Sequence, residues 1–197
     1  MIRVAIVGNI ASGKSQVEKI LLDLGYKVAD TDKINHEILN TDTETINEIK
    51  NTFSNDDILE NNTISREKLG KIVFSNKEKK EKLERILHKR IYKKVEEFFN
   101  KNANEKVVFV SIPLLFETKQ EKTFDKIIFI SADKETRLKR LIERNNYTRE
   151  YALTRINSQM DEEEKLKKSD YVIYNNSGLN ELETSIKDVL SNLEIHN

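Results

Sequence analysis

The chain has 197 residues, in which 34 lysines and arginines balance 34 aspartates and glutamates, with no cysteine and three widely separated histidines. This length suggests one large domain with a buried core. The absence of cysteine excludes disulfides and thiolate metal sites, and the scattered histidines argue against zinc. The zero net charge gives no sign of a nucleic-acid or membrane partner. Because no apolar stretch has the length of a signal or a membrane span, we expect a cytoplasmic protein. The sequence gives no sign of an obligate protein partner.

Five segments rich in β-branched or aromatic residues are predicted to be strands. In chain order they are residues 3–7, 26–30, 106–111, 126–131 and 171–175. Nearly continuous apolar runs are typical of strands covered on both faces. Helical patterns lie between the strands, and the first of these patterns stops at Gly25. The alternation predicts a parallel α/β sheet.

The segment GNIASGKS, residues 8–15, follows the first strand and opens the first helix. It matches GxxxxGK[ST], in which glycines let backbone N–H groups converge on phosphate oxygens. Lys14 can then reach the β- and γ-phosphates of ATP, and the Ser15 hydroxyl can ligate Mg²⁺. The alternative without a function is an ordinary glycine turn followed by an exposed lysine. The predicted nucleotide-binding residues of this loop are Gly8, Asn9, Ile10, Ala11, Ser12, Gly13, Lys14, Ser15 and Gln16.

Two long segments interrupt the simple alternation. Residues 33–103 carry a helical apolar stripe that includes Leu83, Leu87 and Ile91, and they are far longer than a crossover needs. Residues 135–167 are rich in charge, including arginines, and composition alone favours a pair of solvated helices there. A lid that brings cations to the nucleotide is the alternative for this second segment.

Other classes of phosphate-loop protein fit less well. A GTPase would carry NKxD late in the chain, whereas the nearest segment is NKEK at residues 76–79. A hydrolytic ATPase would usually end an apolar strand in an acidic residue, but the third predicted strand runs into Pro113. Asp133 lies beyond the fourth strand, where capping a helix is the commoner role. The sequence therefore favours a small-molecule kinase over a GTPase or a hydrolytic ATPase.

Five further segments follow the loop in a fixed order. They are DTDKINH at 30–36, LHK at 87–89, PLLFE at 113–117, LKRLIERN at 138–145 and DYVIYN at 170–175. Together with GNIASGKS, they resemble the motifs of the dephospho-coenzyme A kinases, which phosphorylate the ribose 3′-hydroxyl of dephospho-CoA with ATP and Mg²⁺. The resemblance extends over nearly the whole chain and implies the final step of coenzyme A biosynthesis, with dephospho-CoA as the small-molecule partner.

The resemblance also implies an architecture. It predicts a five-stranded parallel P-loop NTPase sheet, similar to that of nucleoside-monophosphate kinases, with strand order 2-3-1-4-5. The chain would be a single P-loop kinase domain, residues 1–197. Its core would comprise residues 1–32, 104–134 and 168–197, with a helical acceptor-binding insertion at 33–103 and a lid at 135–167.

Transfer of a phosphoryl group requires an oriented hydroxyl and cations near the developing charge. The resemblance makes Asp32 the candidate to orient or deprotonate the 3′-hydroxyl; the alternative is that Asp32 caps a helix beginning near Ile34. Asp30 stays unassigned. Arg140 and Arg144 are four residues apart on one predicted helix face, and the two could close over the transferred group together with Lys14. The alternative is that other arginines of this segment contribute instead, namely Arg137, Arg149 and Arg155.

The remaining implied contacts involve the acceptor and the nucleotide. The resemblance places His88, Leu115 and Glu117 beside the acceptor and Asn175 beside the nucleotide. The plainer alternatives are a surface histidine for His88 and an ordinary core residue for Leu115.

The chain departs from the family pattern at several positions. Asn9 and Ala11 replace glycines, and we expect Asn9 to adopt the glycine backbone conformation because asparagine tolerates it well. Lys89 replaces a proline and lets the helix continue, and Asn145 replaces an acidic partner for Arg144.

Two other functions remain open from the sequence. One is a P-loop kinase that acts on another small metabolite or nucleoside. The other, from a different class, is a regulatory module that senses ATP without consuming an acceptor.

Overall fold

The computed structural model describes residues 1–195, whose contacts divide the chain into two compact units. The first comprises residues 1–29 and the chain from residue 102 onward, and the second comprises residues 30–101. Within the described residues, no helix combines the length and the apolar character that a membrane span requires.

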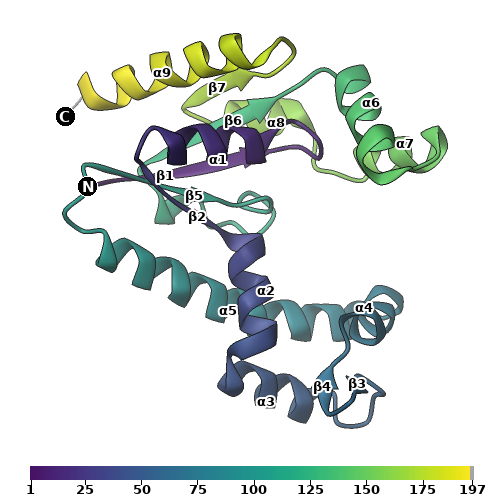
Figure 1. The fold of residues 1–197 in the computed structure, drawn as a ribbon. Coiled ribbons are helices and arrows are strands. Elements are labelled where there is room, and N and C mark those ends of the chain that lie inside the picture. Colours follow the sequence, from purple (N-terminus) through teal and green to yellow (C-terminus); the bar gives the residue numbers. More distant parts are fainter. Residues whose placement is uncertain (196–197) are drawn as a thin grey trace. The chain divides into compact units, whose positions relative to one another are not determined.

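A five-stranded sheet forms the centre of the first unit (Figure 1). Its strand order is β2-β5-β1-β6-β7, which confirms the predicted order 2-3-1-4-5 when these strands are counted along the chain. The central strand β1 pairs in parallel with both β5 and β6. The strands are β1 (Ile2–Gly8), β2 (Lys27–Asp30), β5 (Val107–Ser111), β6 (Lys126–Ser131) and β7 (Tyr171–Tyr174).

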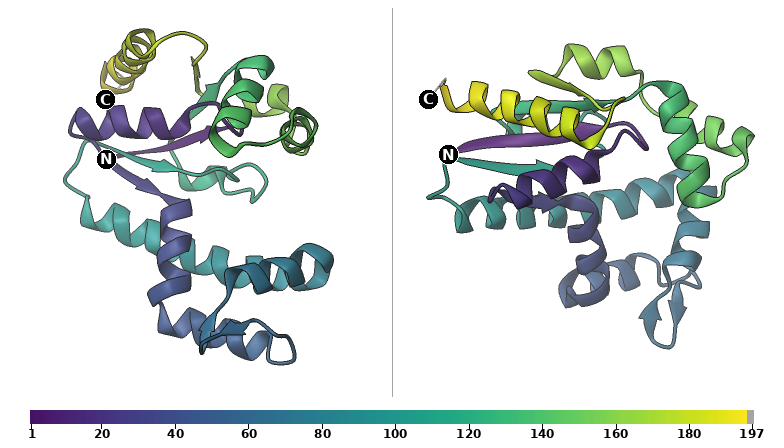
Figure 2. Two further views of the ribbon diagram at one scale, coloured as in Figure 1. Left: turned by 45° about the vertical axis from the view of Figure 1, so that its right-hand side comes forward. Right: turned by 45° about the horizontal axis from the view of Figure 1, so that its top comes forward.

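Two helices cover one face of this sheet, α1 (Lys14–Asp23) and α9 (Leu179–Ile195) (Figures 1 and 2). Their apolar residues form one cluster with inward-facing residues of the strands, such as Ile6 and Phe109. Gly25, with φ 91°, follows the end of α1, as its sequence position predicted. This packing fixes where β1 ends and α1 begins, and the phosphate-binding loop lies between them.

Beyond β5 and β6 the chain forms short helices, η1 (Glu121–Thr123), α6 (Lys134–Asn145), α7 (Arg149–Asn157) and α8 (Glu162–Lys167). Helices α6 and α7 share a small apolar core that includes Leu138, Leu141 and Ile156. Ile10 and Ala11 of the phosphate-binding loop pack against this core. The charged segment is therefore more than a pair of solvated helices, because its apolar side contacts the loop.

The second unit has its own apolar core. It contains α2 (Thr31–Thr41), α3 (Thr43–Thr52), the strands β3 (Leu59–Glu60) and β4 (Thr63–Ile64), α4 (Arg66–Ser75) and α5 (Lys77–Lys101). The short antiparallel hairpin was not predicted; Asn61 and Asn62 form its turn with φ values of 48° and 63°. Helix α5 continues through Lys89, as the replacement of proline predicted. The core residues are Ile38, Ile49, Phe53, Ile58, Leu69, Ile86 and Leu87.

Candidate active site

The two glycines of the phosphate-binding loop lie so close to neighbouring atoms that no Cβ fits at either position. A Cβ on Gly13 would lie 2.0 Å from Nδ2 of Asn175, and Gly13 has φ 96°. A Cβ on Gly8 would lie 2.6 Å from Oγ of Ser12 and 2.9 Å from the carbonyl oxygen of Ile130. Any larger residue at either position would push the loop away from its supports.

The loop turns at residues 9–12, where the Ser12 N–H donates to the Asn9 carbonyl at 3.0 Å. The positive φ of this turn is at Ala11, with φ 61°, and not at Asn9. The prediction that Asn9 takes the glycine conformation was therefore wrong. The alanine accepts the left-handed conformation, and the Asn9 side chain is free to make contacts of its own.

Lys14 lies in the first turn of α1 beside an acidic residue that the sequence analysis missed. Its Nζ is 3.1 Å from Oε1 of Glu18 and also contacts Oγ of Ser111, at the end of β5. The Ser111 hydroxyl donates to the same Glu18 oxygen at 2.5 Å, and Glu18 is only 6% exposed. The i,i+4 spacing of Lys14 and Glu18 was the signal available in the sequence.

Two polar atoms of the loop lack a protein partner. Among the described residues, Oδ1 of Asn9 and Oγ of Ser12 are buried without a hydrogen bond. Such groups are rare in folded proteins and usually meet a water, an ion or a ligand. Ser15 is exposed and Gln16 is half-buried at the start of α1.

Arg140 and Asn175 lie directly against the loop. The Arg140 guanidinium donates to the carbonyl oxygens of Ala11, Ser12 and Asn175 at 3.4, 3.3 and 3.0 Å. The Asn175 side chain donates to the Ser12 carbonyl at 2.8 Å. Arg144, by contrast, is exposed, and its Nε donates to Oδ1 of Asn145 at 2.9 Å. The structure thus brings Arg140, but not Arg144, to the phosphate-binding loop.

The segment after β5 holds the two predicted acceptor residues of the first unit. Leu115 is fully buried, as expected of an ordinary core residue. The Glu117 carboxylate is 2.9 Å from Nζ of Lys165, on α8, and the Lys165 side chain is only 2% exposed. A buried ammonium needs such a partner, so the pair fixes Glu117 to α8.

In the second unit, Asp30 rather than Asp32 caps α2. The helix begins at Thr31, not near Ile34, and the Asp32 N–H donates to Oδ1 of Asp30 at 2.9 Å. The alternative that Asp32 is the cap was therefore wrong. Asp32 lies in the first helical turn and is exposed, and His88 is half-buried on α5.

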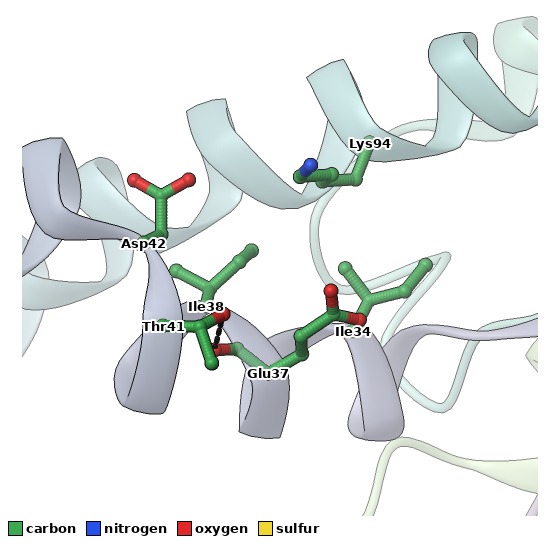
Figure 3. Close-up of a pocket in the computed structure, with 6 residues that line it drawn as sticks. All are labelled: Ile34, Glu37, Ile38, Thr41, Asp42 and Lys94. Atoms are coloured by element: carbon green, nitrogen blue, oxygen red, sulfur yellow. Dashed lines mark hydrogen bonds between the residues drawn. The ribbon is translucent and has the colours of Figure 1, made fainter.

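A pocket of about 140 Å³ lies between α2 and α5 (Figure 3). At its edge, Nε of Arg90 donates to Asp42 at 2.6 Å. Burial raises the pKa of Asp42, but hydrogen bonds from Thr45 and Arg90 and the charge of Arg90 outweigh it and hold the pKa below its ordinary value. The pocket is small for a whole cofactor-sized ligand. It is lined by Ile34, Glu37, Ile38, Thr41, Asp42 and Lys94.

The sequence model of the family described as dephospho-CoA kinase matches residues 2–181. A relative named dephospho-CoA kinase from Listeria innocua is 44% identical over 195 residues, covering 97% of this chain and 95% of the relative. Another of that name, from Fusobacterium nucleatum, is 44% identical over 180 residues, covering 91% of this chain and 92% of the relative.

Solved structures show the same fold. A dephospho-CoA kinase from Campylobacter jejuni has 36% identity and a TM-score of 0.73, covering 97% of this chain and 96% of its own. A shikimate kinase from Acinetobacter baumannii, at 14% identity and a TM-score of 0.53, covers 100% of this chain and 95% of its own. The second likeness concerns the fold alone.

Proposed function

The chain belongs to the dephospho-CoA kinase family, a family of kinases that phosphorylate an alcohol group, and from this premise we propose how its residues carry out the reaction. The protein transfers the γ-phosphate of ATP to the ribose 3′-hydroxyl of dephospho-CoA, giving coenzyme A and ADP. The observation that carries the proposal is the family match over residues 2–181, which includes both the phosphate-binding loop and the insertion. The reaction uses only small molecules, and we assign it to the cytoplasm.

The loop binds the phosphates of ATP through its backbone N–H groups and the start of α1. Lys14 neutralises charge between the β- and γ-phosphates. In the described contacts its ammonium is shared with Glu18 and Ser111, which hold it at the edge of the loop. Arg140 is already anchored on the loop carbonyls and supplies a second cation, while Arg144 joins it in the proposed lid.

Mg²⁺ fits the oxygen donors that the loop offers. Mg²⁺ usually takes one or two protein oxygens, several waters and substrate phosphates, rather than a cage of side chains. The exposed Ser15 hydroxyl would hold it. Within the part of the chain that the structure describes, no three His, Cys, Asp or Glu side chains form a separate metal cluster. When bound, the cation neutralises phosphate charge.

Asp32 orients the 3′-hydroxyl and accepts its proton as the hydroxyl oxygen attacks the γ-phosphorus. Its exposure and its release from the capping role, which Asp30 fills, support this assignment. The insertion binds the rest of the acceptor, with His88 as its proposed contact. Glu117, from the segment after β5, is a second proposed contact, and the fully buried Leu115 supports that segment from the core. The pocket beside Asp42 accommodates at most a fragment of that molecule.

A screen with γ-labelled ATP tests the function. Dephospho-CoA, AMP and adenosine are compared by kcat/KM, with coenzyme A as the matched control because its 3′-position is already phosphorylated. We expect labelled coenzyme A from dephospho-CoA at much higher efficiency than labelled product from AMP or adenosine. A better nucleoside or nucleotide acceptor would refute the named substrate. ATP binding without consumption of any acceptor would instead indicate a sensor.

A further inference from the structure

Two side chains, one just before α8 and one at its first residue, contact the first half of the phosphate-binding loop. The Ile10 N–H donates to Oε1 of Gln159 at 2.9 Å. The Asn9 side chain donates through Nδ2 to Oε2 of Glu162, also at 2.9 Å. Both contacts are partly buried, and both join residues that are about 150 positions apart in the sequence. Neither Gln159 nor Glu162 belongs to a motif that the sequence analysis identified.

Glu162 is itself held by two other elements. Its Oε1 accepts a hydrogen bond from the Ser131 hydroxyl at 2.5 Å, at the end of β6. Its Oε2 lies 3.3 Å from NH2 of Arg137, on α6, whose side chain is 8% exposed. One carboxylate thus joins the loop, the central sheet and the first helix of the charged segment. Charge-assisted hydrogen bonds of this kind are stronger than neutral ones.

These contacts act on the part of the loop that the side chains of Arg140 and Asn175 do not hold. Residues 11–13 are held by Arg140 and Asn175. Asn9 and Ile10, by contrast, have side-chain contacts from Gln159 and Glu162. A loop that is already ordered loses less conformational entropy when it binds a ligand, so its affinity is higher.

Resting on the proposed function, we propose that Gln159 and Glu162 are positioning residues that hold Asn9 and Ile10 in the conformation that binds ATP. They act through the loop and touch neither the acceptor nor the reacting atoms. Because they lie in the same charged segment as Arg140, residues 135–167, they also couple its placement to the shape of the loop.

A double-mutant cycle tests the proposal, with Glu162→Gln, Asn9→Ala and the combination of both. ATP affinity is measured by calorimetry without acceptor, alongside kcat, KM for ATP and Tm. Each single change is expected to weaken ATP binding about tenfold, the size of one hydrogen bond to a charged group. The double variant should bind ATP no more weakly than the weaker-binding single variant. The reason is that Asn9→Ala removes the contact that Glu162→Gln deprives of its charge.

Glu163→Gln is the matched control, since it removes the same charge from the next, exposed position of α8. It should bind ATP as the unmodified protein does. Gln159→Met supplies an independent measurement, because it removes the acceptor of the Ile10 N–H. Hydrogen exchange at that amide should become at least about tenfold faster.

Three outcomes would overturn the proposal. Unchanged ATP affinity with a lowered Tm would show that Glu162 has only a structural role. Additive losses in the cycle would show that the Asn9–Glu162 contact does not carry the effect. Unaltered hydrogen exchange at the Ile10 amide in Gln159→Met would show that the contact with Gln159 does not hold this part of the loop.

Asn9→Ala leaves the contacts of Glu162 with Ser131 and Arg137 intact, so the test stands even if Glu162→Gln folds poorly. Because ATP binding is measured directly, a wrong acceptor assignment would not affect the result.

Discussion

Replacing Asp32 with asparagine separates a catalytic role from a structural one, because Asp30 makes the helix cap beside it. Asparagine keeps the size of the side chain and removes its charge and its ability to accept a proton. Asp30→Ala is the matched variant, since it removes the cap and leaves the Asp32 carboxylate in place. The two changes lie two positions apart and should have opposite effects: Asp32→Asn should lower kcat, and Asp30→Ala should lower Tm.

The expected magnitudes differ enough to be measured together. Loss of a general base typically costs about 10²- to 10⁴-fold in rate. At about 1.4 kcal/mol for each factor of ten, this raises the activation free energy by about 2.8 to 5.6 kcal/mol. Loss of a helix cap costs about 1 kcal/mol of folding stability, which lowers Tm by about 2 to 4 °C in a protein of this size.

Steady-state kinetics with dephospho-CoA, ATP titration and thermal melting on both purified variants provide the assay. Asp32→Asn should bind ATP normally, melt within a few degrees of the unmodified protein and lose at least about a hundredfold in kcat. Asp30→Ala should melt at a lower temperature and keep kcat within about tenfold.

The opposite pattern would refute this reasoning. If Asp32→Asn keeps most of its kcat, the base lies elsewhere, and Asp30 becomes the first candidate. If Asp30→Ala loses as much kcat as Asp32→Asn at an unchanged Tm, the division between cap and base is wrong.

Two further predictions concern Lys14 and Asp42. Lys14→Ala should depress kcat at least about a hundredfold, because it removes a cation from the developing phosphate charge. Its control is Lys14→Ala combined with Glu18→Gln, which removes the carboxylate left unpaired; recovery of near-normal kcat in this double variant would contradict the assigned role. Asp42 has a lowered pKa in the folded protein, so its contribution to stability is present at neutral pH and is lost as pH falls through that lowered value. Urea unfolding between about pH 7 and 3 should therefore show a shallower acid loss of stability for Asp42→Asn than for the unmodified protein, and equal slopes would exclude this contribution.

Much of the fold and of the loop was predictable because both depend on local sequence patterns. Nearly continuous β-branched runs such as Lys126–Ser131 predict buried parallel strands. The spacing of Gly8, Gly13 and Lys14 specifies a phosphate-binding loop, and the structure adds the steric reason for both glycines. The strand order followed from the family resemblance rather than from any single strand.

Local conformation within those patterns was harder to predict. The cap of α2 is Asp30 because the Asp30 backbone is extended and the helix already begins at Thr31, a boundary that composition does not specify. The positive φ falls on Ala11 rather than on the more tolerant Asn9, because the turn closed between Asn9 and Ser12 places it there. The geometry of the turn, more than the intrinsic tolerance of asparagine for positive φ, therefore decided which residue adopts it.

The contacts around the loop were decided only by the tertiary structure. Asn9 and Glu162 are 153 residues apart, and they meet because β6, α6 and α8 converge beside the end of β1. Periodicity reports neighbours three or four residues apart on a helix and two apart on a strand, so it contains no signal for such a contact. The sequence by itself therefore determined that a phosphate-binding loop forms and which strands surround it. Which side chains hold the loop in place depended on how distant elements pack, because packing brings together polar groups that no local spacing relates.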